Sequence, residues 1–279
     1  MDVNELLERY ANGERDFRNL NLIGANLAGL DLSEVTFRDA DLRQANMTAT
    51  KLTGANLREA NLMGVNLHQA NLREANLINA NLSRADLSEA DLSLANISRA
   101  IVERANLQKA KMVQALASET RLGWANLKEV TLNQANLSRA NLSEADLSGA
   151  NLEGANLTIA ILIQAIMEKV NLTNATLNGA NLTGVNLRES DLSRANMSGS
   201  NLAGANLTKS QLRGTNVSWT TMRGTNLEGA SLYRANLGWS NLTGANLTNA
   251  ILMDTNLYRT NLRDVKLTGA IMPDGLTYQ

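Results

Sequence analysis

Residues Ala55–Gly64 read Ala-Asn-Leu-Arg-Glu followed by Ala-Asn-Leu-Met-Gly, and this frame of five residues continues without a break from Leu20 to Asp274. The central position of each five holds Leu in 40 of 51 cases, and all but one of the others are Met, Phe, Ile or Val. The position two before it holds Ala 32 times, and the position immediately before it holds Asn or Asp 35 times. A period of five matches neither the roughly 3.6 residues of an α-helical turn nor the two-residue alternation of a strand. The sequence therefore predicts a repeat protein whose core is one column of residues.

The motif Ala-(Asn or Asp)-Leu followed by two variable residues resembles that of the pentapeptide-repeat proteins, over about 255 of the 279 residues. The resemblance implies an all-β solenoid: a right-handed quadrilateral β-helix in which four fives form one coil and the coils stack through backbone hydrogen bonds. At that coil length the frame holds about 12 to 13 coils. The side-chain amides of the Asn column are expected to form a ladder, donating and accepting along the stack or to neighbouring backbone.

Glycine placement independently supports a coil of twenty residues. Of 19 Gly, 15 occupy the second position after the central residue, and Gly184, Gly204, Gly224 and Gly244 recur at intervals of 20. Glycine tolerates φ > 0, which the third residue of a type II turn requires. These positions are therefore predicted to be the corners of the coil.

Three segments follow from the frame: residues 1–19, 20–274 and 275–279. Val3, Leu6, Leu7 and Tyr10 have helical i, i+3, i+4, i+7 spacing, which predicts a short amphipathic helix as the N-terminal cap of the β-helix. Residues 20–274 form the repeat domain. Its C-terminal end is expected to be covered by the tail 275–279 or by a second chain, because an open end would expose leucines and unpaired backbone. Both ends resemble cyanobacterial family members, including a regulator of heterocyst differentiation with a similar Ile-Met-Pro-Asp-Gly finish.

Composition argues mainly against other classes of protein. The chain has no Cys, one His and 27 acidic against 26 basic residues. No signal peptide and no membrane span is visible, so a cytoplasmic protein is expected, without membrane or direct nucleic-acid binding. A prism filled with leucine offers no cleft for catalysis. His68 is expected on the surface, and we predict no enzyme activity, no cofactor and no metal site.

The outward-facing aromatic residues predict a candidate docking surface. Trp219, Trp239 and Arg259 recur at intervals of 20, which predicts a stack of two indoles and a guanidinium. Tyr258 flanks that column, and Tyr233 with Met253 would form a second ladder. Exposed Trp, Tyr and Arg are typical of interface hot spots, although they also stack on one another for about 0.5 to 1.5 kcal/mol per pair.

Two irregular stretches give lesser candidates. Ala117 occupies a central position while Leu116 precedes it, so one side of the coil is expected to bulge or repack, with Trp124 outward nearby, one coil beyond Arg104. Ile159, Ile161, Ile163 and Ile166 break the polar pattern. Each stretch is explained either by local repacking or by a binding site. The partner-binding candidates are thus Trp219, Trp239, Arg259, Tyr258, Tyr233, Trp124 and Arg104.

Charged residues predict ladders that compensate one another. Arg18, Arg38 and Arg58 fall in one column, with Asp39 and Glu59 beside two of them. Exposed pairs of this kind contribute at most about 1 kcal/mol each. The ladders are therefore expected to be structural.

Three functional hypotheses remain. The first is a rigid protein–protein interaction scaffold or regulator that docks a partner through the aromatic face; its near-zero net charge also permits a homodimer. Resemblance to the cyanobacterial members implies a role in cell differentiation. The second is mimicry of duplex DNA, by which some pentapeptide-repeat proteins engage DNA gyrase, but mimicry needs uncompensated carboxylates and the charges here balance. The third, an enzyme, is disfavoured by the filled core. The sequence does not identify the partner.

Overall fold

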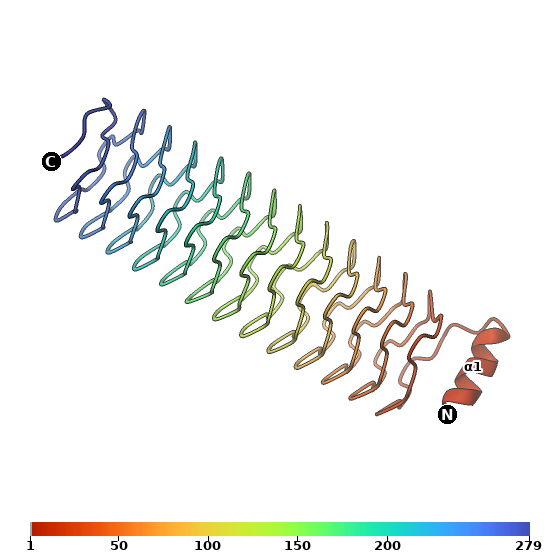
Figure 1. Ribbon diagram of the computed structural model, residues 1–279. Helices are drawn as coiled ribbons and strands as arrows, with labels where there is room; N and C mark the ends of the chain where they lie inside the picture. The colour runs from red at the N-terminus through yellow and green to blue at the C-terminus, as the bar shows by residue number, and fades with distance from the viewer. Residues whose placement is uncertain (1) are drawn as a thin grey trace. The chain divides into compact units, whose positions relative to one another are not determined.

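A computed structural model describes residues 2–279, which form two units, residues 2–140 and residues 141–279. In the first unit, parallel β-bridges join residues twenty positions apart, from Asp16↔Thr36 to Leu116↔Asn136. In the second, the same register runs from Asn141↔Ile161 to Ile251↔Ile271. Bridges recur every five residues, so each twenty-residue coil has four bridging positions, and Figure 1 shows the coils stacked within each unit. The coil length predicted from glycine spacing is confirmed.

Each five-residue repeat uses its backbone hydrogen-bonding groups in the same way. The N–H of Leu57 donates to the carbonyl of Asn76 at 2.7 Å, and the N–H of Glu59 donates to Ile78 at 2.9 Å. Ala60 N–H then donates back to Leu57 at 3.1 Å, which closes a turn. Most backbone groups of a coil are therefore satisfied by the next coil or by the turn, as burial requires.

The corner residues have left-handed backbone, as predicted from glycine, but the corners are not reserved for glycine. Glu59 has φ of 60°, and the β-branched Ile159 has φ of 58°. Left-handed backbone costs an L-residue roughly 1 to 2 kcal/mol. The ladder hydrogen bonds and the core offset this cost, so the solenoid imposes the corner conformation on any residue that occupies it.

The core consists of the central and Ala positions. Leu57, Leu62 and Ala55 are fully buried, as are nearly all their counterparts before the last coil. Each buried Leu contributes about 1.5 to 3 kcal/mol. Where Thr replaces the inward Ala in the second unit, its hydroxyl donates to a buried carbonyl of the preceding coil, as Thr215 does to Leu192 at 2.7 Å. These buried hydroxyls are therefore satisfied.

The Asn column forms the expected ladder. Asn46 Nδ2 donates to Asn26 Oδ1 one coil earlier at 3.1 Å. Its own Oδ1 accepts from the backbone N–H of Thr48 at 3.2 Å. An Asp carboxylate can replace the second contact but cannot donate along the stack, which explains why both residues occur here and Asn dominates.

Helix α1 (Val3–Ala11) precedes the first coil (Figure 1), as the sequence predicted. Asp2 caps it by accepting from the N–H of Glu5 at 2.9 Å. Leu6 is fully buried, and the Tyr10 hydroxyl donates to the carbonyl of Ser33 at 2.9 Å. Leu22, in the first coil, is only 4% exposed, so α1 covers this end of the first unit. Among residues 2–279, no helix has the length and apolar character to cross a bilayer.

Of the two outcomes expected at Ala117, a bulge or local repacking, the bulge is wrong. Leu116 bridges in register to both Asn96 and Asn136, and Ala117 is fully buried in the central position. The N–H of Ala117 donates to Asn136 at 2.8 Å, as a central Leu would. The hydrogen bonds that pair this coil with its neighbours use backbone groups alone. Leu before a central Ala, in place of a polar residue before a central Leu, therefore leaves Leu116 half-exposed without altering the coil.

Candidate functional site

The predicted stack of Trp219, Trp239 and Arg259 is present in the second unit. The two indole rings lie 4.8 Å apart with an interplanar angle of 5°. The guanidinium carbon of Arg259 lies 4.4 Å from the centre of the Trp239 ring. The residues stack because parallel in-register pairing spaces equivalent positions by about 4.8 Å, close to the separation of stacked rings.

Tyr258 completes this group, which we call the aromatic column: Trp219, Trp239, Arg259 and Tyr258. The Tyr258 ring meets Trp239 edge-on, with centres 6.1 Å apart and an angle of 76°. Gly238 lies one coil before Tyr258, and a Cβ there would be 3.2 Å from the side-chain oxygen of Asn236. The sequence interpretation did not include this glycine, whose lack of a side chain lets the Asn236 amide lie close to the backbone.

Stacking does not bury the aromatic column. Trp219 remains 63% exposed, Trp239 41% and Tyr258 61%. Structural packing would be expected to remove most of this apolar surface from water. The column thus presents a preformed aromatic surface to solvent.

Tyr233 belongs to a second cluster on the same unit. The guanidinium carbons of Arg234 and Arg213 lie 4.9 and 5.4 Å from its ring centre. Arg234 also contacts Asp254, with 3.3 Å between Nε and Oδ2. Met253 is exposed, as expected. The sequence interpretation missed both arginines, although Arg213 precedes Tyr233 by one coil and the spacing of twenty would have found it.

Trp124 and Arg104 belong to the first unit. The guanidinium carbon of Arg104 lies 5.4 Å from the ring centre, and the indole is 49% exposed. The predicted neighbours therefore meet. His68, also in this unit, is half-buried, and its Nδ1 lies 2.9 Å from the Ser88 hydroxyl oxygen.

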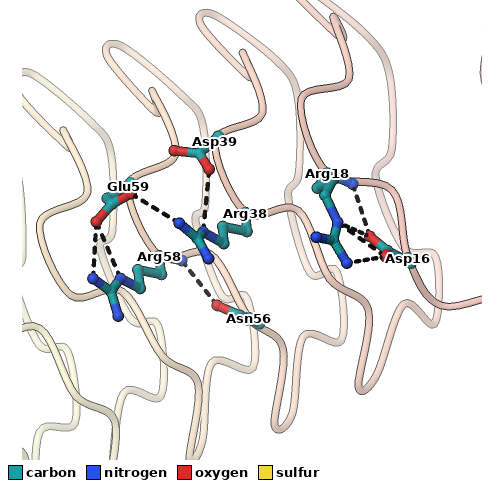
Figure 2. Close-up of polar contacts among 7 residues, drawn as sticks. All are labelled: Asp16, Arg18, Arg38, Asp39, Asn56, Arg58 and Glu59. Carbon is teal, nitrogen blue, oxygen red and sulfur yellow. Dashed lines mark hydrogen bonds and ion pairs between the residues drawn. The ribbon is translucent and has the colours of Figure 1, made fainter.

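The charged columns of the first unit compensate one another, as Figure 2 shows for two adjoining arginines. Arg38 Nε lies 3.1 Å from Asp39, and its Nη2 lies 3.6 Å from Glu59. Arg58 Nη2 lies 3.0 Å from the same Glu59. One carboxylate therefore joins the arginines of two successive coils, and the ladder offers little uncompensated charge to a partner.

We expect Arg58→Gln to raise the pKa of Glu59. The side-chain hydrogen bond from Arg58 lowers the pKa of this carboxyl below its ordinary value, with further lowering from the charges of Arg58 and Arg38. A depressed pKa stabilises the fold above the unfolded-state pKa, and that contribution is lost as pH falls through the folded-state pKa. The stability difference between wild type and Arg58→Gln should thus be present at neutral pH and vanish in strong acid.

Carbon-detected NMR titration of the glutamate carboxyls measures this shift directly. Arg99→Gln is the matched control, because Arg99 pairs with Glu119 and not with Glu59. An unchanged Glu59 titration in Arg58→Gln would contradict the assignment.

The last coil of the second unit is only partly covered. Leu257, Leu262 and Leu267 occupy central positions but are half-exposed. The tail folds back beside one side of the coil, where Thr277 forms an antiparallel bridge with Ile271 and Gly269 N–H donates to Tyr278 at 2.8 Å. The expected tail cap is therefore present on one side, and the leucines of the other sides remain accessible.

Comparison with known proteins gives one family and several related structures. The family model described as pentapeptide repeats matches residues 16–54, 40–77, 75–114, 120–158, 160–188, 190–229 and 230–269. HetL, a pentapeptide repeat protein involved in heterocyst differentiation regulation from the cyanobacterium Nostoc sp. strain PCC 7120, is 30% identical, with 100% of both chains covered and a TM-score of 0.26.

Two further solved structures are similar over part of the chain. QnrB1, a plasmid-mediated fluoroquinolone resistance protein, is 20% identical over 74% of this chain and 90% of its own, with a TM-score of 0.38. A pentapeptide repeat protein from the thylakoid lumen of Arabidopsis thaliana is 31% identical over 42% of this chain and 68% of its own, with a TM-score of 0.22. No curated protein matches the chain.

Proposed function

The chain belongs to the pentapeptide repeat family, and we propose that it is a non-enzymatic interaction protein that docks a protein partner through the aromatic column. The observation that carries this proposal is the exposure of Trp219, Trp239 and Tyr258, which stays between 41% and 63% although their rings pack together. Trp, Tyr and Arg are the residues most enriched in interface hot spots.

The rigidity of the aromatic column supports the same proposal. Trp239 is held between the Trp219 ring and the Arg259 guanidinium, so its rotamer is already selected before a partner arrives. Immobilising a mobile side chain costs about 0.5 to 1.5 kcal/mol on binding. A preformed stack avoids much of that cost, so more of the free energy gained by burying its exposed aromatic surface appears as affinity.

The family relationship supports the remaining parts of the proposal. Identity of 30% to HetL over both full chains favours a regulatory role in cyanobacterial cell differentiation. Membership of the family supports a right-handed, four-sided winding of the coils, and the unbroken frame supports a division into the cap 1–19, the repeat domain 20–274 and the tail 275–279.

The test is affinity capture from the native cell lysate, comparing wild type with the Trp219→Ala/Trp239→Ala variant by quantitative mass spectrometry. We expect the variant to lose its partner, because hot-spot residues each contribute about 2 kcal/mol or more, and two together correspond to a loss of affinity of roughly 700-fold or more. Both side chains point outward, so circular dichroism and the unfolding midpoint should change little.

Ile23→Ala/Met63→Ala is the matched control, because it removes two exposed apolar side chains from the first unit. It should retain the partner. Equal capture by all three proteins would remove the aromatic column from the proposal, and equal capture of a topoisomerase would favour DNA mimicry with DNA gyrase as the target.

We also propose that two copies associate through the open C-terminal coil. The half-exposed Leu257, Leu262 and Leu267 support this, because apolar side chains at an open edge favour association. Leu262→Lys should lower the association constant by about tenfold or more in sedimentation measurements over a range of concentrations. Ile161→Lys is the control, because Ile161 is exposed but lies in a coil that is paired on both sides. Equal association constants for the two variants would contradict the proposal.

A further inference from the structure

The charge of the second unit is balanced overall but polarised along the chain. Residues 141–191 contain six acidic and two basic residues, whereas residues 192–279 contain four acidic and eight basic residues. The aromatic column lies within the basic part. The basic residues there are Arg194, Lys209, Arg213, Arg223, Arg234, Arg259, Arg263 and Lys266.

Two arginines near the aromatic column have no carboxylate of their own. Asp254 pairs with Arg234, and Asp264 pairs with Arg263. Within residues 2–279, by contrast, neither Arg223 nor Arg259 forms an ion pair, and the Arg259 guanidinium lies against the rings of Trp239 and Tyr258. Exposed cations that the fold leaves uncompensated are available to an anionic partner.

Arg223 lies on the same coil as Trp219, and the surface around them is unobstructed. Arg223 follows Trp219 by four residues, beyond the corner, and is exposed. Next to it is the glycine corner column, where a Cβ built on Gly224 or Gly244 would meet no atom within 4 Å. The space next to these two corners is therefore open, so an extended segment has room to cross them.

The aromatic column also retains one open ring face. Trp239 lies between Trp219 and Arg259 and is 41% exposed, whereas Trp219 has a ring partner on one side only and is 63% exposed. On the other side the preceding residue of the column is Gly199, where an added Cβ would meet nothing within 4 Å. A partner side chain can therefore extend the stack over Trp219.

We propose that the partner binds through an acidic segment that places carboxylates on Arg223 and Arg259 and an apolar or aromatic side chain on the open face of Trp219. This inference rests on the proposed function, since it specifies the ligand of the aromatic column. Arginine binds carboxylates through paired hydrogen bonds, so the two guanidiniums supply register while the indole supplies apolar contact.

The alternative anion, a single-stranded nucleic acid, is less well matched. Such ligands stack successive bases on separate aromatic platforms along a basic groove. Here Trp239 is closed on both faces, so the two stacked indoles leave one open face, that of Trp219. A carboxylate of an acidic protein segment binds to a guanidinium without a row of aromatic platforms, so an acidic segment is the favoured ligand.

The experiment selects a displayed library of random peptides of about ten residues, which extend over roughly 33 Å, on the full-length chain. Selection on the Trp219→Ala/Trp239→Ala variant identifies the peptides that depend on the aromatic column. We expect those peptides to be enriched in Asp and Glu and depleted in Lys and Arg. An aromatic or large apolar residue should accompany the acids.

Affinities of the best peptide test the arginines. Arg223→Gln should weaken binding about tenfold and Arg223→Glu about 100-fold, whereas Arg223→Lys should recover part of the loss. Arg194→Gln is the matched control, because Arg194 is another exposed arginine of the second unit without an ion pair and lies on a different side of the coil. Its effect should be below twofold.

Each other outcome overturns a distinct statement. Column-dependent peptides without an excess of acids, or peptides indifferent to Arg223→Glu, would refute the acidic segment but retain the docking surface. Binding of a short oligothymidylate that depends on Trp219 and exceeds the peptide affinity would assign the surface to nucleic acid. Absence of any column-dependent peptide would refute the acidic segment, whereas the proposed function is refuted only by equal capture in the lysate experiment.

Discussion

Leu77→Asp should unfold the coils around residue 77 in the first unit at neutral pH. Leu77 is fully buried, and its N–H donates to Asn96 at 2.7 Å in the middle of the ladder. The substitution removes roughly 1.5 to 3 kcal/mol of apolar burial. It also places a carboxyl where burial raises a pKa by about 3 to 5 units, which adds roughly 4 kcal/mol at about pH 7, because a carboxyl with a folded-state pKa above about 7 is already neutral in the folded protein.

Ile78→Asp is the matched control, because the neighbouring side chain points outward and is half-exposed. It should change stability by less than about 0.5 kcal/mol. Hydrogen exchange read by mass spectrometry should show loss of protection in the coils around residue 77 for Leu77→Asp only. Since the introduced carboxyl has a raised pKa in the folded state, protection should return partly as pH falls below that value. Equal protection in both variants would show that this column is not a dry core.

Ala90→Phe should destabilise the first unit by about 3 kcal/mol or more, at or above the upper end of the usual cost of overpacking. Ala90 is fully buried, and its carbonyl accepts from the N–H of Lys111 at 2.8 Å. That hydrogen bond sets the distance to the next coil, and the next coil has an inward Ala in the same column, Ala110. The coil therefore cannot move apart to admit a ring without losing ladder bonds.

Leu94→Phe tests the same enlargement at an exposed corner. Leu94 already has φ of 62°, so Phe adds no new backbone strain, and its side chain is 41% exposed. Urea denaturation should give a change below about 0.5 kcal/mol for Leu94→Phe. A similar midpoint shift for both variants would mean that the alanine position has more room than its burial implies.

Much of the candidate site could be predicted because the coil length of twenty residues decides which outward side chains are neighbours. Residues twenty positions apart meet through the parallel bridges, so Trp219 and Trp239 had to stack and Arg259 had to follow them. The same rule applied to Tyr233 would have predicted its contact with Arg213. That omission was one of interpretation, since the signal was present in the sequence.

Other features depend on side-chain choices that spacing does not decide. Arg38 contacts both Asp39 and Glu59, whereas Arg223 has no carboxylate within the described chain. Both are arginines in outward positions next to a corner, so the motif alone does not distinguish them. Long side chains select among several partners at similar free energy, and only their placement in the folded coil shows which cations remain available.

The sequence by itself determined the coil length, the core column, the corners and α1, because each follows from a local repeat that every coil enforces on the next. The tertiary structure alone decided that Ala117 stays in register, that left-handed corners accept residues such as Ile159, and that Leu257 and Leu262 remain half-exposed. The physical reason is common to all three. Backbone pairing between coils overrides the preference of a single side chain, and at the last coil the tail supplies that pairing along one side only.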